Sequence, residues 1–298
     1  MGRVWVVGSL NVDRPWRVAR HPQVGETVTG EVLAPIPGGK GLNQAVAARR
    51  MGADVALVGV VGPDADGTWL RAVAVEEGID VGALVTAADP QVTTGTALIV
   101  IADDGANTVT VAPGANALLE ADGLAIAAGD VVVAQLEVPV EAVGRAFAAA
   151  RAVGARTVLN PSPVGVGASL AAEADVVVVN EHELAALDGG AVPGSPAEAA
   201  ARAAGLASDA RSVVVTLGAS GAVADGPAGG LVVAGSQVDA VDTTGAGDCF
   251  LGVLAAALAG GSPVPDAVRR ANRAAALSVT RLGTVAAMPT AAEVDATS

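Results

Sequence analysis

Two aspartates and two glycines stand before a long apolar run near the C-terminal end of the sequence: Asp242, Gly245, Gly247 and Asp248. The run over 249–258 is rich in helix formers and a glycine pair follows it, which predicts a helix that begins close to Asp248. Unpaired N–H groups at a helix N-terminus favour an anion, and glycine lets the backbone approach it. A carboxylate beside such a cradle could take a hydroxyl proton during phosphoryl transfer. The same pattern is also typical of a tight turn with an N-cap aspartate.

A second glycine-rich segment precedes another expected helix. Residues 38–43 read Gly-Gly-Lys-Gly-Leu-Asn, and an alanine-rich stretch over 44–52 that ends in glycine predicts the helix. The segment is not a Walker A loop, because glycine and not serine or threonine follows the lysine. Lys40 is the one lysine among the 17 basic residues. A cation and an amide at a helix entrance can hydrogen-bond a polar ligand.

Polar residues also follow the ends of expected strands. A buried strand over 4–8 leads to Asn11 and Asp13, and a strand over 130–137 ends at Glu137. Side chains two residues apart in an extended segment share one face. In an open α/β sheet, ligands bind beyond the carboxyl ends of the strands, so these side chains could line a ligand site. A turn that uses Asn and Asp for local hydrogen bonds is the alternative.

Strands and helices alternate along most of the chain, which predicts an α/β fold with a mostly parallel sheet. Two segments, at about 14–36 and 92–112, interrupt this alternation, and we expect them to pair into a small sheet outside the main one. We see no linker or repeat and therefore expect a single domain over residues 1–298, with 193–196 as a loop within it. The expected buried strands are 4–8, 54–62, 130–137, 157–161, 175–179, 212–216 and 231–233, and the expected helices are 44–52, 68–78, 141–154 and 249–258.

Composition argues against several classes of function. With 17 basic and 31 acidic residues the formal net charge is −14, the reverse of what nucleic-acid binding requires. Two histidines are too few for multi-histidine metal sites and leave most Ser-His-Asp arrangements incomplete. No apolar run is long enough to span a membrane, and the N-terminal segment is typical of a strand and not of a signal peptide. One cysteine, Cys249, excludes an internal disulfide and favours a reducing cytoplasm.

Taken together, these motifs resemble the ribokinase family, the phosphofructokinase B-type carbohydrate kinases. The resemblance extends from Gly8 to about Pro289 and depends on the two glycine-rich signatures, 38–43 and 242–248, in the family's order. The segments 8–13, 25–28, 113–116 and 276–283 also match. The resemblance implies a three-layer α/β/α fold in which the small sheet is a β-lid that closes over the sugar and pairs two subunits in a homodimer.

The resemblance further implies roles for single residues. Asp248 would be the base for the accepting hydroxyl, with Gly245, Ala246 and Gly247 as the anion hole. Asn180 and Glu183 would organise Mg²⁺ and the phosphates. The sugar hydroxyls would be bound by Asn11, Asp13, Gly39, Lys40, Asn43 and Glu137. The ATP site would be lined by Thr216, Gly218, Gly221 and Asn272. A potassium site would use Asp242 and Thr244 with carbonyls of Ser278, Arg281 and Gly283.

The activity that the resemblance implies is transfer of the γ-phosphate of ATP to the 5-hydroxyl of D-ribose. Another sugar, such as deoxyribose or a ketohexose, is an alternative, because a single hydroxyl contact separates these substrates. A nucleoside is disfavoured, since 3 Trp, 2 Phe and no Tyr leave few rings to stack on a base. A non-catalytic sugar sensor is the alternative from another class, and Asp248 argues against it because a sensor needs no base.

Overall fold

The larger of two β-sheets forms the centre of the molecule. The structure is a computed structural model that describes residues 2–165 and 167–297. Within these residues nine strands pair in the order β14-β13-β12-β11-β10-β9-β1-β5-β6. Strands β12 through β6 in this order are parallel, and β13 and β14 are antiparallel to their neighbours. The strands are β1 (Val4–Val7), β5 (Val55–Val61), β6 (Leu84–Thr86), β9 (Val131–Gln135), β10 (Arg156–Asn160), β11 (Val176–Asn180), β12 (Ser212–Thr216), β13 (Gly221–Asp225) and β14 (Leu231–Ala234).

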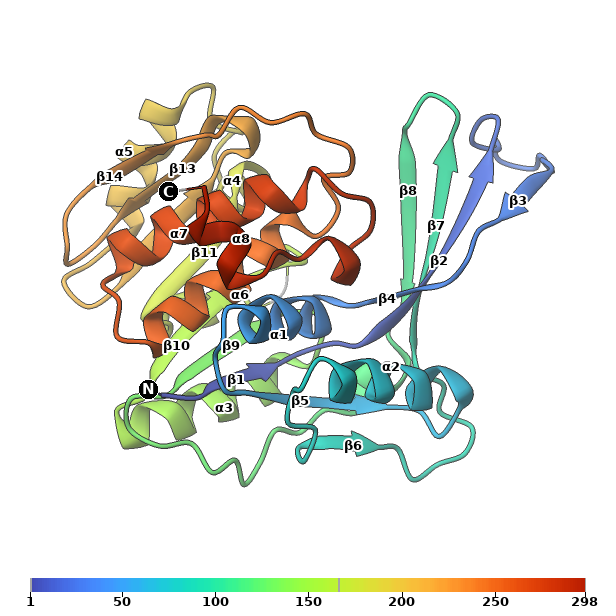
Figure 1. The fold of residues 1–298 in the computed structure, drawn as a ribbon, viewed down its shortest axis with the longest axis horizontal. Coiled ribbons are helices and arrows are strands. Elements are labelled where there is room, and N and C mark those ends of the chain that lie inside the picture. Colours follow the sequence, from blue (N-terminus) through green and yellow to red (C-terminus); the bar gives the residue numbers. More distant parts are fainter. Residues whose placement is uncertain (1, 166, 298) are drawn as a thin grey trace.

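Helices cover both faces of this sheet, because its strands are apolar on both sides. In β1, Val4 and Val6 pack into one hydrophobic cluster, whereas Trp5 and Val7 pack into the other. Residues of α1, α2, α6, α7 and α8 join the first cluster, and residues of α3, α4 and α5 join the second. The predicted three-layer α/β/α fold is therefore confirmed (Figure 1). The helices are α1 (Lys40–Arg50), α2 (Ala65–Glu76), α3 (Val140–Val153), α4 (Glu181–Asp188), α5 (Pro196–Leu206), α6 (Ala246–Ala259), α7 (Val264–Ser278) and α8 (Ala291–Asp295).

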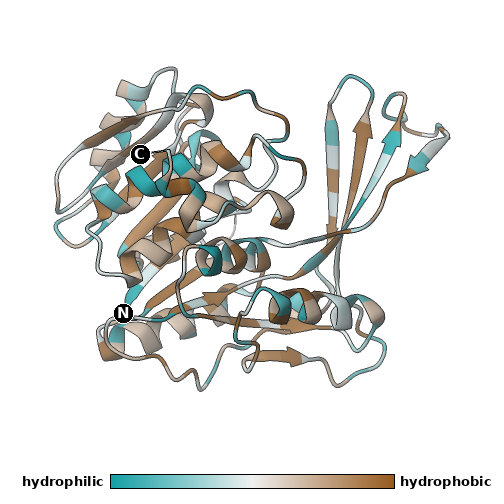
Figure 2. Cartoon of the chain, in the orientation of Figure 1, coloured by the Kyte–Doolittle hydropathy of each residue, from teal (hydrophilic) through white to brown (hydrophobic). Residues whose placement is uncertain are grey.

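A smaller five-stranded sheet stands apart from this body (Figure 1). Strand β2 follows β1 along the chain, pairs in parallel with β7, and has β3 and β4 as antiparallel partners, while β8 pairs with β7. Figure 2 shows hydrophilic stretches on these strands, in contrast to the hydrophobic central strands. The sheet begins at Asn11 and includes a strand that ends at Gly38, so it is wider than the predicted 14–36 and 92–112. Its strands are β2 (Asn11–Val18), β3 (Gly30–Val32), β4 (Ile36–Gly38), β7 (Gly95–Ala102) and β8 (Asn107–Ala112).

Three helices, α1, α2 and α6, begin at least three residues earlier than the sequence predicted. Helix α1 starts at Lys40, directly after Gly39, whose φ of 88° is a left-handed value that favours glycine. The lysine therefore belongs to the first turn of the helix and not to the loop before it. Helix α2 starts at Ala65 and not at residue 68, because the carboxylate of Asp64 caps it by accepting from the Gly67 N–H over 2.8 Å.

Residues 193–195 form a loop, as the sequence predicted, but Pro196 already belongs to α5, a helix that the sequence analysis did not predict. The hydroxyl of Ser195 accepts from the Glu198 N–H over 3.2 Å, and Pro196 occupies the first turn of α5, where a missing N–H costs nothing. The expected elements also lacked strand β13, which lies between β14 and β12 and is antiparallel to both. Strand β13 is outside the parallel alternation from which the fold was predicted, whereas α5 lies in the crossover between the parallel strands β11 and β12.

Candidate active site

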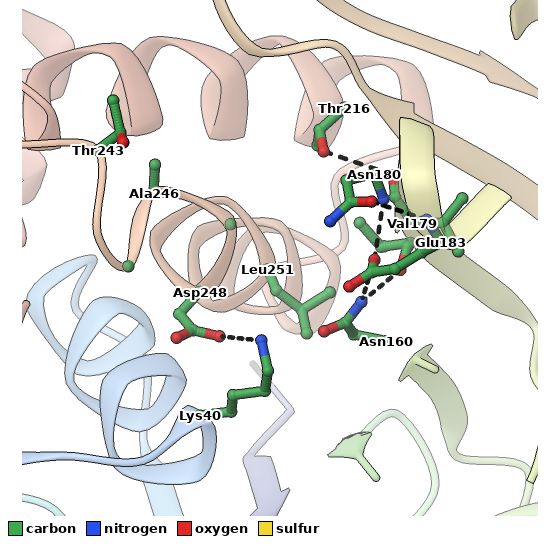
Figure 3. Close-up of a pocket in the computed structure, with 13 residues that line it drawn as sticks. Lys40, Asn160, Val179, Asn180, Glu183, Thr216, Thr243, Ala246, Asp248 and Leu251 are labelled. Atoms are coloured by element: carbon green, nitrogen blue, oxygen red, sulfur yellow. Dashed lines mark hydrogen bonds and ion pairs between the residues drawn. The ribbon is translucent and has the colours of Figure 1, made fainter. Parts of the chain in front are cut away.

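The N-termini of α1 and α6 bring the two glycine-rich segments together around Asp248. The Asp248 side chain lies in the first turn of α6 and is buried, with 6% of the residue exposed. Its Oδ2 accepts from Asn43 Nδ2 over 3.0 Å, and its Oδ1 lies 4.0 Å from Lys40 Nζ. Figure 3 shows the lysine and the aspartate facing one another at one side of the cavity. A carboxylate, a cation and an amide thus share one small polar space.

The residues expected to form an anion hole lie at the start of α6. Gly245 has a φ of 76° and precedes the first helical residue, and it lines the same cavity as Ala246, Gly247 and Asp248. The Ala246 N–H donates to the Thr243 carbonyl over a long 3.3 Å. Within the described part of the chain, the N–H groups of Gly245 and Gly247 have no backbone acceptor. Two of the three expected amides are therefore free for an anion, and the third is held in a turn.

The residues expected to bind sugar form a cluster between β2 and the start of α1. Asn11 is buried, and its Oδ1 accepts from Asn116 Nδ2 over 2.8 Å. Glu137 Oε2 accepts from the Lys40 N–H over 3.2 Å, so this carboxylate also caps α1. Burial, and then the charges of Glu137 and Asp248, raise the pKa of Asp13 to about 7.

Lys40 is the counter-charge of this acidic cluster. Burial by itself would lower the pKa of Lys40, but the charges of Asp248, Glu137 and Glu183 raise it overall. The ammonium group therefore stays protonated between the proposed base and the phosphate side of the cavity. Gly39, which precedes it, has no room for a side chain, because a Cβ there would lie 2.7 Å from the Asn11 backbone nitrogen.

The side chain of Asn43 also indicates that a ligand binds here. Its Nδ2 donates to Asp248, so its Oδ1 points the other way, and this buried oxygen has no hydrogen-bond partner among the described residues. A buried amide oxygen without a partner is costly unless a ligand or water supplies a donor. A sugar hydroxyl is a donor of the kind that this oxygen requires.

The two residues expected to organise Mg²⁺ and the phosphates, Asn180 and Glu183, form a capping box at the start of α4. Asn180 Oδ1 accepts from the Glu183 N–H over 2.8 Å, and Glu183 Oε2 accepts from the Asn180 N–H over 2.9 Å. Asn160, at the end of β10, donates to the same Glu183 oxygen over 3.0 Å, as Figure 3 shows. The pair is held rigidly before any ligand arrives, and the buried carboxylate suits Mg²⁺, which keeps several of its waters.

A larger cavity of about 430 Å³ continues from this point. It shares Asn180, Thr216 and Gly247 with the polar cavity around Asp248. Its walls also include three further residues that the sequence assigned to ATP, namely Gly218, Gly221 and Asn272. The two cavities meet at the start of α6. A nucleotide in the larger cavity could therefore direct its phosphates at the free amides.

The expected potassium residues lie in the loop before α6, at the last residue of α7 and in the loop after α7, and Asp242 joins the two loops. Its Oδ1 accepts from the Thr244 N–H and its Oδ2 from the Gly283 N–H, each over 2.9 Å. Burial would raise the pKa of Asp242, but these bonds lower it overall. Ser278 is buried and its hydroxyl donates to the Ala275 carbonyl, while Arg281 pairs with Glu293. Carboxylate and carbonyl oxygens suit a hard cation such as K⁺. Among the described residues, no group of three or more His, Cys, Asp or Glu could hold a metal ion.

Four further buried or half-buried amides belong to this hydrogen-bond network and were not predicted as site residues. Gln44, Asn116 and Asn160 bond to predicted site residues, and Gln135 bonds to Gln44. Gln44 follows Asn43 within an otherwise apolar helix face, and Gln135 ends a strand of valine and alanine. A polar residue inside an apolar run is a signal that could have identified both. Asn116 lies in a segment that the sequence analysis named without assigning it a role.

A buried carboxylate beside a helix N-terminus with free amides, next to a second and larger cavity, is typical of a phosphotransferase that acts on a small polar acceptor. Residues 1–291 match the family model described as "pfkB family carbohydrate kinase". The chain therefore belongs to the pfkB family of carbohydrate kinases. The predicted family and the predicted class of enzyme are therefore confirmed. Within the described residues, no helix has both the length and the apolar character needed to cross a membrane.

The relatives are similar over almost their whole length. The chain is 35% identical to a ribokinase from Haemophilus influenzae over 296 residues, which covers 97% of this chain and 95% of that protein. It is 35% identical to a ribokinase from Bacillus subtilis over 301 residues, with 99% of both proteins covered. A ribokinase from Cryptococcus neoformans var. grubii in complex with ADP has a TM-score of 0.88 and 30% identity, with 100% of this chain and 99% of that chain covered.

Proposed function

We propose that this chain is an ATP-dependent ribokinase that converts D-ribose and ATP to D-ribose 5-phosphate and ADP. One observation carries the proposal: the buried Asp248 carboxylate and the free amides of Gly245 and Gly247 face the same cavity. Its similarity to ribokinases supports the choice of sugar, as does the fold it shares with an Arabidopsis thaliana ribokinase complexed with ribose and ATP (TM-score 0.86, 27% identity).

In the proposed reaction Asp248 takes the proton of the 5-hydroxyl as that oxygen attacks the γ-phosphorus. The new bond joins the ribose oxygen to phosphorus, and the bond from phosphorus to the bridging oxygen breaks, with its electron pair leaving on ADP. The amides of Gly245 and Gly247 stabilise the charge of the transferring group. Lys40, 4.0 Å from the base, offsets the negative charge that gathers between acceptor and donor.

The cofactors in this proposal are Mg²⁺ and K⁺. Glu183 and Asn180 would hold Mg²⁺ beside the phosphates, where the ion neutralises phosphate charge. The loops that Asp242 joins would hold K⁺ with Thr244 and the carbonyls of Ser278, Arg281 and Gly283. K⁺ would then stabilise the loop that leads directly into the anion cradle.

We further propose that the small sheet is a lid and a dimer interface. A lid excludes water, so that phosphate passes to the sugar instead of being hydrolysed. Three of its apolar side chains are well exposed, Trp16 at 41%, Val32 at 65% and Val109 at 53%. Exposed apolar side chains gathered on one sheet favour a second copy of the chain as partner. The buried single cysteine fits a cytoplasmic enzyme.

The second candidate is a kinase for a neighbouring sugar. The chain is also 32% identical to a Salmonella typhi deoxyribokinase, with 95% of this chain and 94% of that protein covered. A sugar panel with ATP, measured through ADP release with and without K⁺, tests both candidates. We expect the largest kcat/KM with ribose, and a larger value with deoxyribose or fructose would overturn the ribose assignment. The absence of ADP release with every sugar would favour a sugar sensor.

The proposed dimer needs a separate test. Light scattering gives the molar mass of the protein in solution, and a value of one chain would contradict the dimer.

A further inference from the structure

Two buried glutamines connect the proposed base to the central sheet. Gln44, on α1, donates from its Nε2 to Asp248 Oδ1 over 2.9 Å. Gln135, the last residue of β9, donates from its Nε2 to Gln44 Oε1 over 2.7 Å. Both side chains are fully buried, and neither lines the polar cavity or the larger cavity beside it. The two bonds thus form a chain from β9 through α1 to α6.

The chemistry of the three groups allows only one orientation of this chain. An ionised carboxylate accepts and cannot donate, so Gln44 must present its NH₂ group to Asp248. Its carbonyl oxygen then faces the NH₂ group of Gln135. A rotation of the Gln44 amide by half a turn would lose both bonds at once. Gly8 makes room for the arrangement, because a Cβ at this position would overlap the amide of Gln135.

Gln44 and Asn43 divide the two oxygens of the base between them. Gln44 donates to Oδ1, and Asn43 donates to Oδ2 over 3.0 Å. A carboxylate has about four lone-pair positions, so two such bonds fix its plane and still leave room for a proton. The two amides differ in their carbonyl oxygens. The Asn43 oxygen is free for a ligand, whereas the Gln44 oxygen accepts a hydrogen bond from Gln135.

The charges around Asp248 indicate why a fixed hydrogen-bond donor such as Gln44 would matter to this carboxylate. Lys40 faces it from α1 at 4.0 Å, while the negative charges of Asp13 on β2, of Glu137 and of Glu183 lie around the same cluster. Nearby negative charge and burial oppose ionisation of a carboxylate, whereas donors to its ionised form favour it. We propose that Gln44 is a positioning residue that keeps Asp248 ionised and aimed at the acceptor hydroxyl, with Gln135 fixing the orientation of Gln44. This inference rests on the proposed kinase function.

Gln44→Met tests the inference, because methionine has nearly the same length but donates no hydrogen bond. We expect kcat with ribose to fall about 10- to 100-fold, as when a bond to a charged group is lost. The KM for ribose should stay within about twofold, since Gln44 does not line the cavity. The acid limb of the kcat–pH profile should move to higher pH, because the carboxylate loses a donor that favours its ionised form.

Gln44→Glu makes the sharper prediction. Two carboxyl groups at this distance share one proton, so the acid limb should move further than in Gln44→Met, by more than about one pH unit. Gln135→Met keeps the contact between Gln44 and Asp248 but removes its outer support, and we expect a smaller shift in the same direction. This variant carries the test if the Gln44 variants do not fold.

Val46→Ala is the matched control on α1. Val46 is fully buried in the same helix and belongs to the hydrophobic core. The change should lower the melting temperature and leave the pH midpoint of kcat in place. An unchanged kcat and pH profile in Gln44→Met, or a rise in KM alone, would overturn the inference while the wild type remains an active kinase. A wild type that phosphorylates no sugar would overturn the proposed function and the inference with it.

Discussion

The hydroxyl of Thr284 donates to the Pro37 carbonyl over 3.1 Å and so joins the proposed potassium loop to strand β4 of the small sheet. The residue before Thr284, Gly283, is bound by Asp242. The methyl group of Thr284 lies against the cradle, because a Cβ built on Gly245 would come within 3.3 Å of it. One buried threonine therefore touches the cation loop, the anion cradle and the strand that leads to the sugar side.

Thr284→Val should uncouple these three parts, because valine keeps the shape of threonine but donates no hydrogen bond. The Pro37 carbonyl, on a half-buried residue, would lose this donor, at a cost of about 0.5 to 1.5 kcal/mol. We expect the KM for ribose to rise about five- to tenfold and the stimulation by K⁺ to weaken, both measured by ADP release. Thr280→Val is the control, since its hydroxyl bonds only to the local Leu277 carbonyl. Equal effects of the two variants would contradict the coupling.

Gly245→Ala should damage the cradle through its backbone. The φ of 76° at this residue is left-handed, and a side chain there costs about 1 to 2 kcal/mol. The added Cβ would also press on Thr284 at 3.3 Å. We expect kcat to fall about 100-fold as the amides turn from the phosphate, with a smaller change in the KM for ribose. Gly144→Ala, in the interior of α3 with 3.7 Å to its nearest neighbour, should leave kcat unchanged. An unchanged kcat in Gly245→Ala would remove Gly245 from the anion hole.

Much of the fold could be predicted from the sequence because its signals are local. Strand β11 is a run of valines, and both glycine-rich segments stand directly before the helices that they start. The first residues of helices could be predicted less well. Asp64 caps α2 through the nearby Gly67 N–H, but its carboxylate is also held by Thr94, thirty positions away, which no local pattern indicates. Alanine-rich α5 was missed because its proline and glycine neighbours suggested a loop.

The candidate site, too, could be predicted in part from local sequence patterns and in part only from the structure. The sequence could indicate that Asp248 and the segment 38–43 matter, since residue type and spacing carry that signal. It could not indicate that Gln44 donates to Asp248, because 204 positions separate the two residues. Glu137 illustrates a further limit. It was predicted as a sugar contact, and its role as the cap of α1 appears only when β9 and α1 are placed side by side.

Asp13 predicts an unusual pH dependence of stability. Its pKa of about 7 in the folded chain lies above the ordinary value of 3.8, so the folded protein binds this proton more tightly. Stability from this group is therefore full below about pH 4 and is lost as pH rises through about 7. Without sugar and above pH 7, the free energy of unfolding of Asp13→Asn should exceed that of the wild type by about 1 to 3 kcal/mol, after allowance for the partial exposure of this side chain. Thermal melting curves measure the difference. The gap should close toward pH 4, and the exposed Asp209→Asn should produce none. A gap independent of pH would contradict this assignment.

Lys40→Met should separate sugar binding from chemistry. The ammonium group is the counter-charge to Asp248, Glu137 and Glu183, so its loss leaves like charges facing one another. We expect the KM for ribose to rise about 10- to 100-fold, with a smaller fall in kcat, in initial-rate measurements. Arg49→Met is the control on the last turn of the same helix and should change neither constant. A KM equal to that of the wild type would remove Lys40 from the sugar site.

Asp248→Asn should abolish most turnover and also disturb one neighbour in a specific way. Losing the base should lower kcat by about 10²- to 10⁴-fold. The new NH₂ group must then face either Asn43 or Gln44, each of which now donates to the carboxylate. Gln44 keeps its bond to Gln135 only if both amides rotate together, whereas Asn43 can rotate alone and has a free oxygen to offer. Asn43 should therefore turn its oxygen toward the new amide and present its NH₂ group to the sugar, which raises the KM for ribose about fivefold. A crystal structure of the variant would reveal this rotation through its hydrogen-bond partners, and retained turnover would refute Asp248 as the base.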